Sequence, residues 1–128
     1  MAEMSNYLEN ALINVTLRAT SYTAPAAVYV GLYTTDPTDA NTGTEVSGGS
    51  YARTAVTMGA PSNGVSTNSA AVTFPTATGT WGTVGWIGIL DASTSGNLLY
   101  HTPLDASKSI TSGDIFTIAI GNLSVTLG

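Results

Sequence analysis

The fold class is decided by the stretch AVYVGLY at residues 27–33. Its two valines and Leu32 alternate with its two tyrosines. A period of two residues places the aliphatic side chains on one face of a β-strand and the tyrosines on the other. This stretch therefore predicts a strand, and its aliphatic face is expected to line a core.

Short apolar stretches of the same kind recur through the rest of the chain. Turn-forming residues separate them, as in Ser47-Gly48-Gly49 and Gly121-Asn122. Seven short strands with frequent turns predict a mainly β chain, an antiparallel β-sandwich or a jelly-roll-like barrel over residues 27–127. The six further strands are predicted at residues 51–57, 71–74, 84–90, 97–101, 115–120 and 123–127.

One amphipathic α-helix is predicted before the strands, at residues 5–18. From Leu8 onward, its apolar residues fall at positions i, i+3, i+4 and i+7, which gathers them on one stripe. Asn6, followed three residues later by Glu9, predicts a capping box at the start of the helix. We expect the stripe to dock on a sheet or on a neighbouring subunit.

The longest stretch without periodicity is DPTDANTGTEVSGGS at residues 36–50. Its composition predicts a surface loop or an extended arm, and loops of this length are commonly functional. Asp36, Asp39, Asn41 and Glu45 carry the oxygen ligands that calcium prefers, but their spacing is not that of an EF-hand. A calcium site and a solvated turn region are therefore both compatible with this loop.

The composition limits the kinds of partner that the protein can have. The chain has 128 residues and a mass of 13.0 kDa, which predicts one domain over residues 1–128. Charged residues make up only 9%, and the net charge of -5 argues against a nucleic-acid partner. No apolar run approaches the roughly 18 residues that cross a bilayer, so membrane insertion is not expected. The lack of cysteine excludes disulfides and thiolate metal sites.

The sequence contains no catalytic motif, and we expect neither enzymatic activity nor a cofactor. His101 is the single histidine, and no nucleophile elbow precedes any serine. A structural role for His101 is therefore favoured over a catalytic triad with Asp91 or Asp105.

The aromatic residues suggest a sugar-stacking surface as an alternative function. Trp81 lies among glycine and threonine residues, which makes it the better candidate for an exposed ring. Trp86 lies in an apolar strand and fits a core or a subunit interface.

The scarcity of charge favours surfaces that lie against other protein, because an unpaired charge is costly to desolvate. We therefore expect a homo-oligomer. The strand at residues 84–90 has apolar groups on both faces, so its second face needs cover from the helix or from another subunit. Deleting residues 40–48 is expected to spare the fold and to reduce association. The interface candidates are Tyr7, Leu8, Leu12, Asp36, Asp39, Glu45, Tyr51 and Trp81.

Four motifs follow one another after the predicted helix. They are YTAPAAVYVGLYTTDPT at residues 22–38, GTEVSGGSYAR at 43–53, WGTV at 81–84 and GNLLYH at 96–101. Together with the Ser112-Gly113-Asp114 turn, this order resembles a family of small structural proteins of tailed bacteriophages, which includes tail-fibre proteins. Capsid decoration or cement proteins have a similar size and a similar β-rich build.

The resemblance implies a non-catalytic virion protein that is assembled in the host cytoplasm with other virion proteins. It does not distinguish the phage head from the tail. Because the chain has no fibrous repeat, we prefer a capsid decoration protein that binds the major capsid protein on the head exterior. The alternative is a tail-fibre or tail-associated protein that contacts the host surface. A third possibility is a carbohydrate-binding module that uses Trp81 and the tyrosines.

Overall fold

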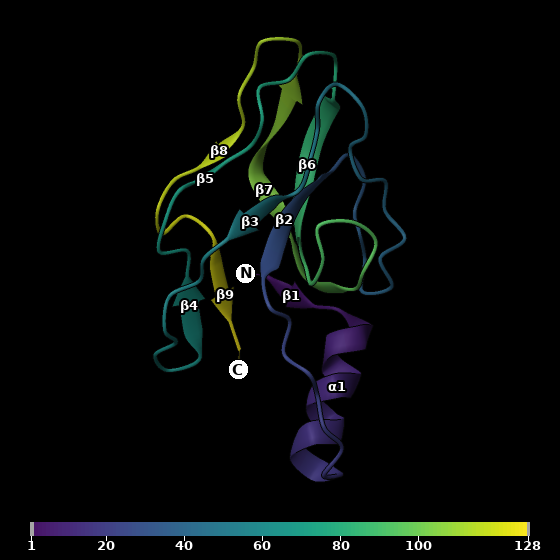
Figure 1. Ribbon diagram of the computed structural model, residues 1–128, viewed down its shortest axis with the longest axis vertical. Helices are drawn as coiled ribbons and strands as arrows, with labels where there is room; N and C mark the ends of the chain where they lie inside the picture. Colours follow the sequence, from purple (N-terminus) through teal and green to yellow (C-terminus); the bar gives the residue numbers. More distant parts are fainter. Residues whose placement is uncertain (1, 128) are drawn as a thin grey trace.

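A computed structural model of the protein describes residues 2–127. Its largest element is a five-stranded antiparallel sheet with the strand order β1-β7-β6-β2-β3 (Figure 1). The sheet is open, with β1 and β3 at its two edges. Its strands are β1 (Glu3–Met4), β2 (Val28–Tyr33), β3 (Thr54–Val56), β6 (Gly82–Leu90) and β7 (Leu98–Ile110).

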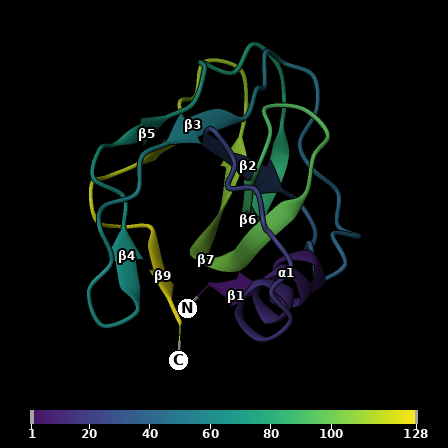
Figure 2. The same cartoon turned by 60° about the horizontal axis from the view of Figure 1, so that its bottom comes forward.

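Two short antiparallel ladders lie on one side of this sheet, as both cartoon views show (Figures 1 and 2). One pairs β4 (Val65–Thr67) with β9 (Ser124–Thr126), and the other pairs β5 (Val72–Thr73) with β8 (Thr117–Ile118). The main hydrophobic core includes Val30, Leu32, Ile87, Ile89, Val72, Phe74, Phe116, Ile118 and Val125. Its members come from both the sheet and the ladder segments. The predicted mainly β fold is therefore confirmed, and the open sheet fits the sandwich rather than the barrel alternative.

Each of the seven predicted strand stretches overlaps a strand of the structure. The largest difference is β7, predicted over residues 97–101, which continues to Ile110 while it pairs with β6. An irregularity accompanies this extension: between Val84 and Trp86 of β6, the paired residue on β7 changes from Lys108 to Pro103. The sequence analysis missed β1 and β4, because strands of two or three residues are too short to show a period.

The predicted helix is present as α1 (Asn6–Leu17). Its N-cap is Ser5, so the predicted capping box starting at Asn6 is wrong. The Ser5 Oγ atom accepts a hydrogen bond from the Leu8 amide and donates one to the Leu98 carbonyl of β7. Ser5 is buried and has extended backbone angles, so it joins β1 directly to the helix.

α1 projects away from the sheets, and Leu8 is its one buried residue (Figures 1 and 2). Leu12 is half-buried, and Val15 at the far end of the predicted stripe is exposed. The docking that the stripe predicts is therefore achieved only near the base of the helix, against β7.

The loop at residues 36–50 lies over the second face of the central sheet. From β2, the Tyr33 hydroxyl donates a hydrogen bond to Asn41 Oδ1 over 3.1 Å. From β7, His101 Nε2 lies 2.8 Å from Asp39 Oδ1. The expected cover by α1 or by another subunit is thus largely supplied by the chain's own loop.

The same loop also forms a backbone hydrogen bond along the edge of β2. The Val46 amide donates to the Leu32 carbonyl over 2.9 Å, and the Val46 side chain is buried in the core. In the structure, residues 36–50 form a loop that packs against the body of the protein. Deleting residues 40–48 removes both Val46 and the ion-pair partner of Arg53, Glu45, so from the structure we expect this deletion to destabilise the fold.

Candidate functional site

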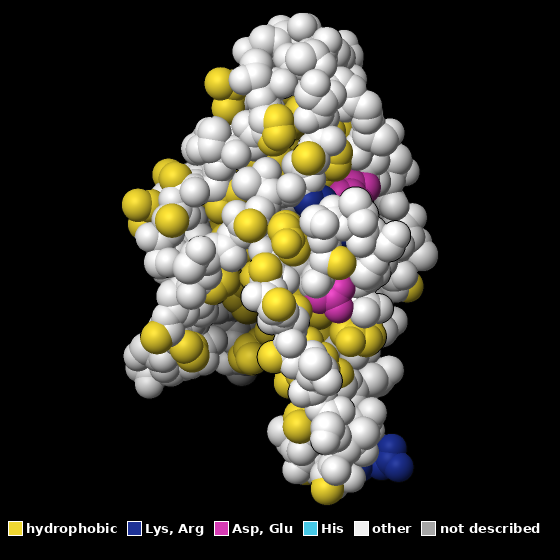
Figure 3. Space-filling view, viewed as in Figure 1, with side chains coloured by type: hydrophobic (Ala, Val, Ile, Leu, Met, Phe, Trp, Pro, Cys, Tyr) yellow, Lys and Arg dark blue, Asp and Glu magenta, His cyan; other side chains and the backbone are white. Residues whose placement is uncertain are grey.

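Helix α1 carries large apolar side chains that the rest of residues 2–127 leaves exposed. Leu17 is 79% exposed, Ile13 is 53% exposed, and Val15 and Tyr7 are each 41% exposed. In the space-filling view, hydrophobic groups are visible on the helix down to its tip (Figure 3). We call Ile13 and Leu17 the helix tip pair: they are four residues apart and therefore lie on the same helix face.

The interface candidates at the base of α1 have different environments. Tyr7 is exposed, Leu12 is half-buried, and Leu8 is buried against the body. Only Tyr7 and Leu12 therefore present surface to a partner in this conformation.

Glu45 and Tyr51, two other interface candidates, belong to an internal network around Arg53. The Arg53 guanidinium donates to both carboxylate oxygens of Glu45, each over 2.8 Å. Tyr51 donates its hydroxyl hydrogen to Glu45 Oε2 over 2.6 Å and accepts the Leu32 amide hydrogen at 3.0 Å. At Gly31 a Cβ atom would lie only 2.9 Å from Glu45 Oε2, so the glycine makes room for this network.

Arg53 also connects this network to the loop that follows β6. Its Nη1 atom donates to the carbonyls of Ala92, at 2.9 Å, and Ser95, at 2.7 Å. The network therefore fastens two loops to the sheet. Two of the four residues considered as calcium ligands therefore have partners within the protein: Glu45 is paired with Arg53, and Asn41 accepts a hydrogen bond from Tyr33.

The expectation of an exposed Trp81 is wrong, because its side chain lies in the hydrophobic core and is only 4% exposed. Its Nε1–H group donates to the Gly49 carbonyl over 2.8 Å. The ring meets Tyr51 edge-on, with ring centroids 5.3 Å apart. Trp81 therefore offers no sugar-stacking surface. This close packing requires a glycine at position 49, since a Cβ there would lie 2.9 Å from Trp81 Nε1.

His101 is buried, and its nearest acidic partners come from the 36–50 loop and β1. The triad partners weighed in the sequence analysis do not form its close contacts. Asp91 accepts hydrogen bonds from the backbone and side chain of Asn97, which is a turn-forming role. The loop residues Asp36 and Asp39 are therefore brought together around His101, a proximity that the sequence analysis missed.

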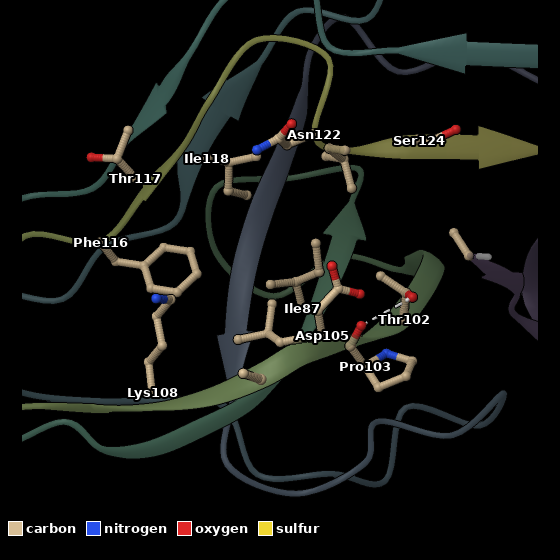
Figure 4. Close-up of a pocket in the computed structure, with 14 residues that line it drawn as sticks. Ile87, Thr102, Pro103, Asp105, Lys108, Phe116, Thr117, Ile118, Asn122 and Ser124 are labelled. Atoms are coloured by element: carbon tan, nitrogen blue, oxygen red, sulfur yellow. Dashed lines mark hydrogen bonds between the residues drawn. The ribbon is translucent and has the colours of Figure 1, made fainter.

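A groove of about 490 Å³ lies between the second half of β7 and the C-terminal segment (Figure 4). Phe116 and Ile118 line it from the C-terminal segment, and Asp105 and Lys108 line it from β7. Both charged residues are exposed. The groove is thus lined by a mixture of apolar and polar side chains, and its two charged residues are exposed rather than buried as in a catalytic pocket.

We predict that the protein loses stability at alkaline pH because of its buried tyrosines. Burial, with a smaller contribution from the Glu45 charge, raises the pKa of Tyr33 from 10.0 to about 12. Burial and the hydrogen bond to Glu45 also raise the pKa of Tyr51. The unfolded chain therefore releases these protons first, so stability is retained below pH 10 and falls as the pH rises through 12.

For Tyr33 alone, the expected loss of unfolding free energy is about 2–3 kcal/mol. Urea denaturation followed by circular dichroism between pH 8 and pH 12 measures it. The Tyr33→Phe variant is expected to show a smaller decline over this range. An unfolding midpoint that stays constant up to pH 12 would contradict the prediction.

Within residues 2–127, no helix has both the length and the apolar character to cross a bilayer. Exposed apolar side chains such as those of the helix tip pair are typical of surfaces that contact other proteins. A family model described as Podophage GP4 fiber I protein gp80 matches residues 3–126. The chain belongs to this family, which confirms the resemblance to bacteriophage virion structural proteins and implies association with other virion proteins. A comparison with curated proteins finds no match.

Proposed function

We propose that the protein is a non-catalytic tail-fibre component whose helix α1 joins it to further copies of itself. The observation that carries this proposal is the fiber family match over residues 3–126. The match favours the tail-fibre alternative over the capsid decoration role that the sequence analysis preferred. The projecting helix supplies a candidate joint for assembly.

The energetics of α1 support a role in assembly. Fully burying a side chain such as leucine or isoleucine is favourable by about 1.5–3 kcal/mol. The helix tip pair, Ile13 and Leu17, leaves most of this free energy unrealised in a single copy. If a second copy packs the same apolar surface against the first, the exposed side chains of both helices are buried at once, as in symmetric oligomers.

We predict that the double variant Ile13→Asp and Leu17→Asp shifts the protein from an oligomer to a monomer. Aspartate at the helix tip pair removes the apolar contact and places unpaired charges in the interface. Size-exclusion chromatography with light scattering measures the mass of each species. Far-UV circular dichroism checks that the body stays folded, since both residues lie outside the core.

The control variant Thr94→Asp adds one negative charge at an exposed site in the loop after β6. It is expected to keep the oligomeric mass of the unmodified protein. A monomeric unmodified protein, or a double variant that remains oligomeric, would refute the proposed joint.

The position in the particle is tested separately by counting copies in purified virions with quantitative mass spectrometry. A tail-fibre component is expected in small multiples set by the symmetry of the tail. Hundreds of copies per particle would instead establish the capsid decoration role.

A further inference from the structure

We propose that Glu3, Asp39 and His101 form a binding site for a divalent transition-metal cation, with Zn²⁺ as the best fit. The three residues come from β1, the 36–50 loop and β7, so the fold assembles the site from separate segments. Their candidate ligand atoms all lie within 4.8 Å of one another. His101 Nε2 is 2.8 Å from Asp39 Oδ1 and 4.0 Å from Glu3 Oε2.

The sheet register fixes two of the ligands relative to each other. Glu3 and His101 are directly paired across β1 and β7, so their side chains lie on the same face of the sheet. The imidazole is held rigidly because its side chain is only 6% exposed, whereas the Glu3 side chain is 72% exposed. A buried, oriented nitrogen ligand thus lies beside a carboxylate that can adjust to an incoming ion.

The charge around His101 favours a cation. A third carboxylate, that of Asp36, lies 3.9 Å from His101 Nδ1. The chain has three basic residues, and all three have other surroundings. Arg53 is paired with Glu45, Arg18 donates to Asn14, and Lys108 lines the groove of Figure 4. The three carboxylates around His101 are therefore not neutralised by lysine or arginine.

The mixed nitrogen and oxygen donors identify the class of ion. Zn²⁺ accepts histidine nitrogen and carboxylate oxygen at about 2.0–2.2 Å, whereas Ca²⁺ takes oxygen ligands. With Nε2 toward Glu3 and Asp39, the Nδ1 atom lies 3.9 Å from Asp36 Oδ1. A carboxylate on the far side of a ligating histidine is a common supporting arrangement in metal sites.

The proposed metal site lies next to the start of α1, so a bound metal would affect how the helix is attached to the body. The Asn6 amide at the start of α1 donates to the Asp39 carbonyl over 3.0 Å, and β1 leads directly into the helix. A metal bound by Glu3, Asp39 and His101 therefore cross-links the loop, β1 and β7 at the base of the projecting helix. This inference is independent of the proposed tail-fibre function.

The test uses the full-length protein, treated with EDTA and then dialysed free of chelator. Isothermal titration with ZnCl₂ is expected to show one site per chain, and Zn²⁺ is expected to raise the thermal unfolding midpoint. Glu3→Gln and Asp39→Asn are each expected to weaken Zn²⁺ binding by at least about tenfold. Glu3→Gln is the cleaner variant, because the Glu3 side chain is largely exposed.

The matched controls are Glu9→Gln and Asp105→Asn, which remove exposed carboxylates outside the cluster. They are expected to bind Zn²⁺ as the unmodified protein does. The inference is overturned if Zn²⁺ does not bind, or if Glu3→Gln and Asp39→Asn bind it as tightly as the controls. It is also overturned if Ca²⁺ binds as tightly as Zn²⁺, because the imidazole would then have no role.

Discussion

Replacing Arg53 with methionine is expected to lower the free energy of unfolding by about 3–5 kcal/mol. The Arg53 side chain is only 10% exposed, and its partner Glu45 is 23% exposed. The substitution leaves the Glu45 carboxylate without its counter-charge and removes donors from the carbonyls of Ala92 and Ser95. Urea denaturation followed by far-UV circular dichroism measures the loss.

The comparison variant is Arg18→Met, because Arg18 is exposed at the end of α1 and its side chain donates only to Asn14. We expect it to change stability by less than about 0.5 kcal/mol. Combining Arg53→Met with Glu45→Met should recover part of the loss, since no charge is then left unpaired. If Arg53→Met were no more harmful than Arg18→Met, the network would not be holding the two loops.

Replacing Trp81 with alanine is expected to cost about 3–5 kcal/mol of unfolding free energy. The change removes a ring that is 4% exposed and leaves a cavity beside Tyr51. It also removes one of the two hydrogen-bond donors to the Gly49 carbonyl, the other being the Thr78 amide. The same urea titration measures the effect.

Two variants separate the contributions of the ring and of its donor. Trp81→Phe keeps an aromatic ring in the core but loses the bond to Gly49, so its loss should be smaller than that of the alanine variant. Trp86→Ala removes a half-buried ring of the same kind and should also cost less. A Trp81→Ala protein as stable as Trp86→Ala would show that Trp81 is not a central core residue.

The strands were predictable where local pattern and burial agree. β2 alternates between two faces of a sheet, and β6 is a long apolar stretch paired on both sides, so a period or an apolar run marks each of them. The helix was recognised from its spacing, but its docking was not. The sequence of residues 5–18 gives no signal that Leu8 is the one helix residue buried against the body.

The polar contacts were not predictable, because they depend on tertiary structure. Asp39 and His101 are 62 residues apart, and only the folding of the loop over the sheet brings them together. Trp81 was misassigned for a related reason. Glycine beside an aromatic residue permits either exposure or close approach of another backbone segment, and the partner segment at Gly49 is 32 residues away.

The closure of the 36–50 loop over the central sheet means that this face is covered within a single copy of the chain. Dissociation and unfolding then become separate events with separate thresholds. If the helix tip pair is the joint, pulling two copies apart exposes only a few side chains and leaves each body intact. Two copies joined in this way would separate on dilution into bodies that are ready to join again, without refolding.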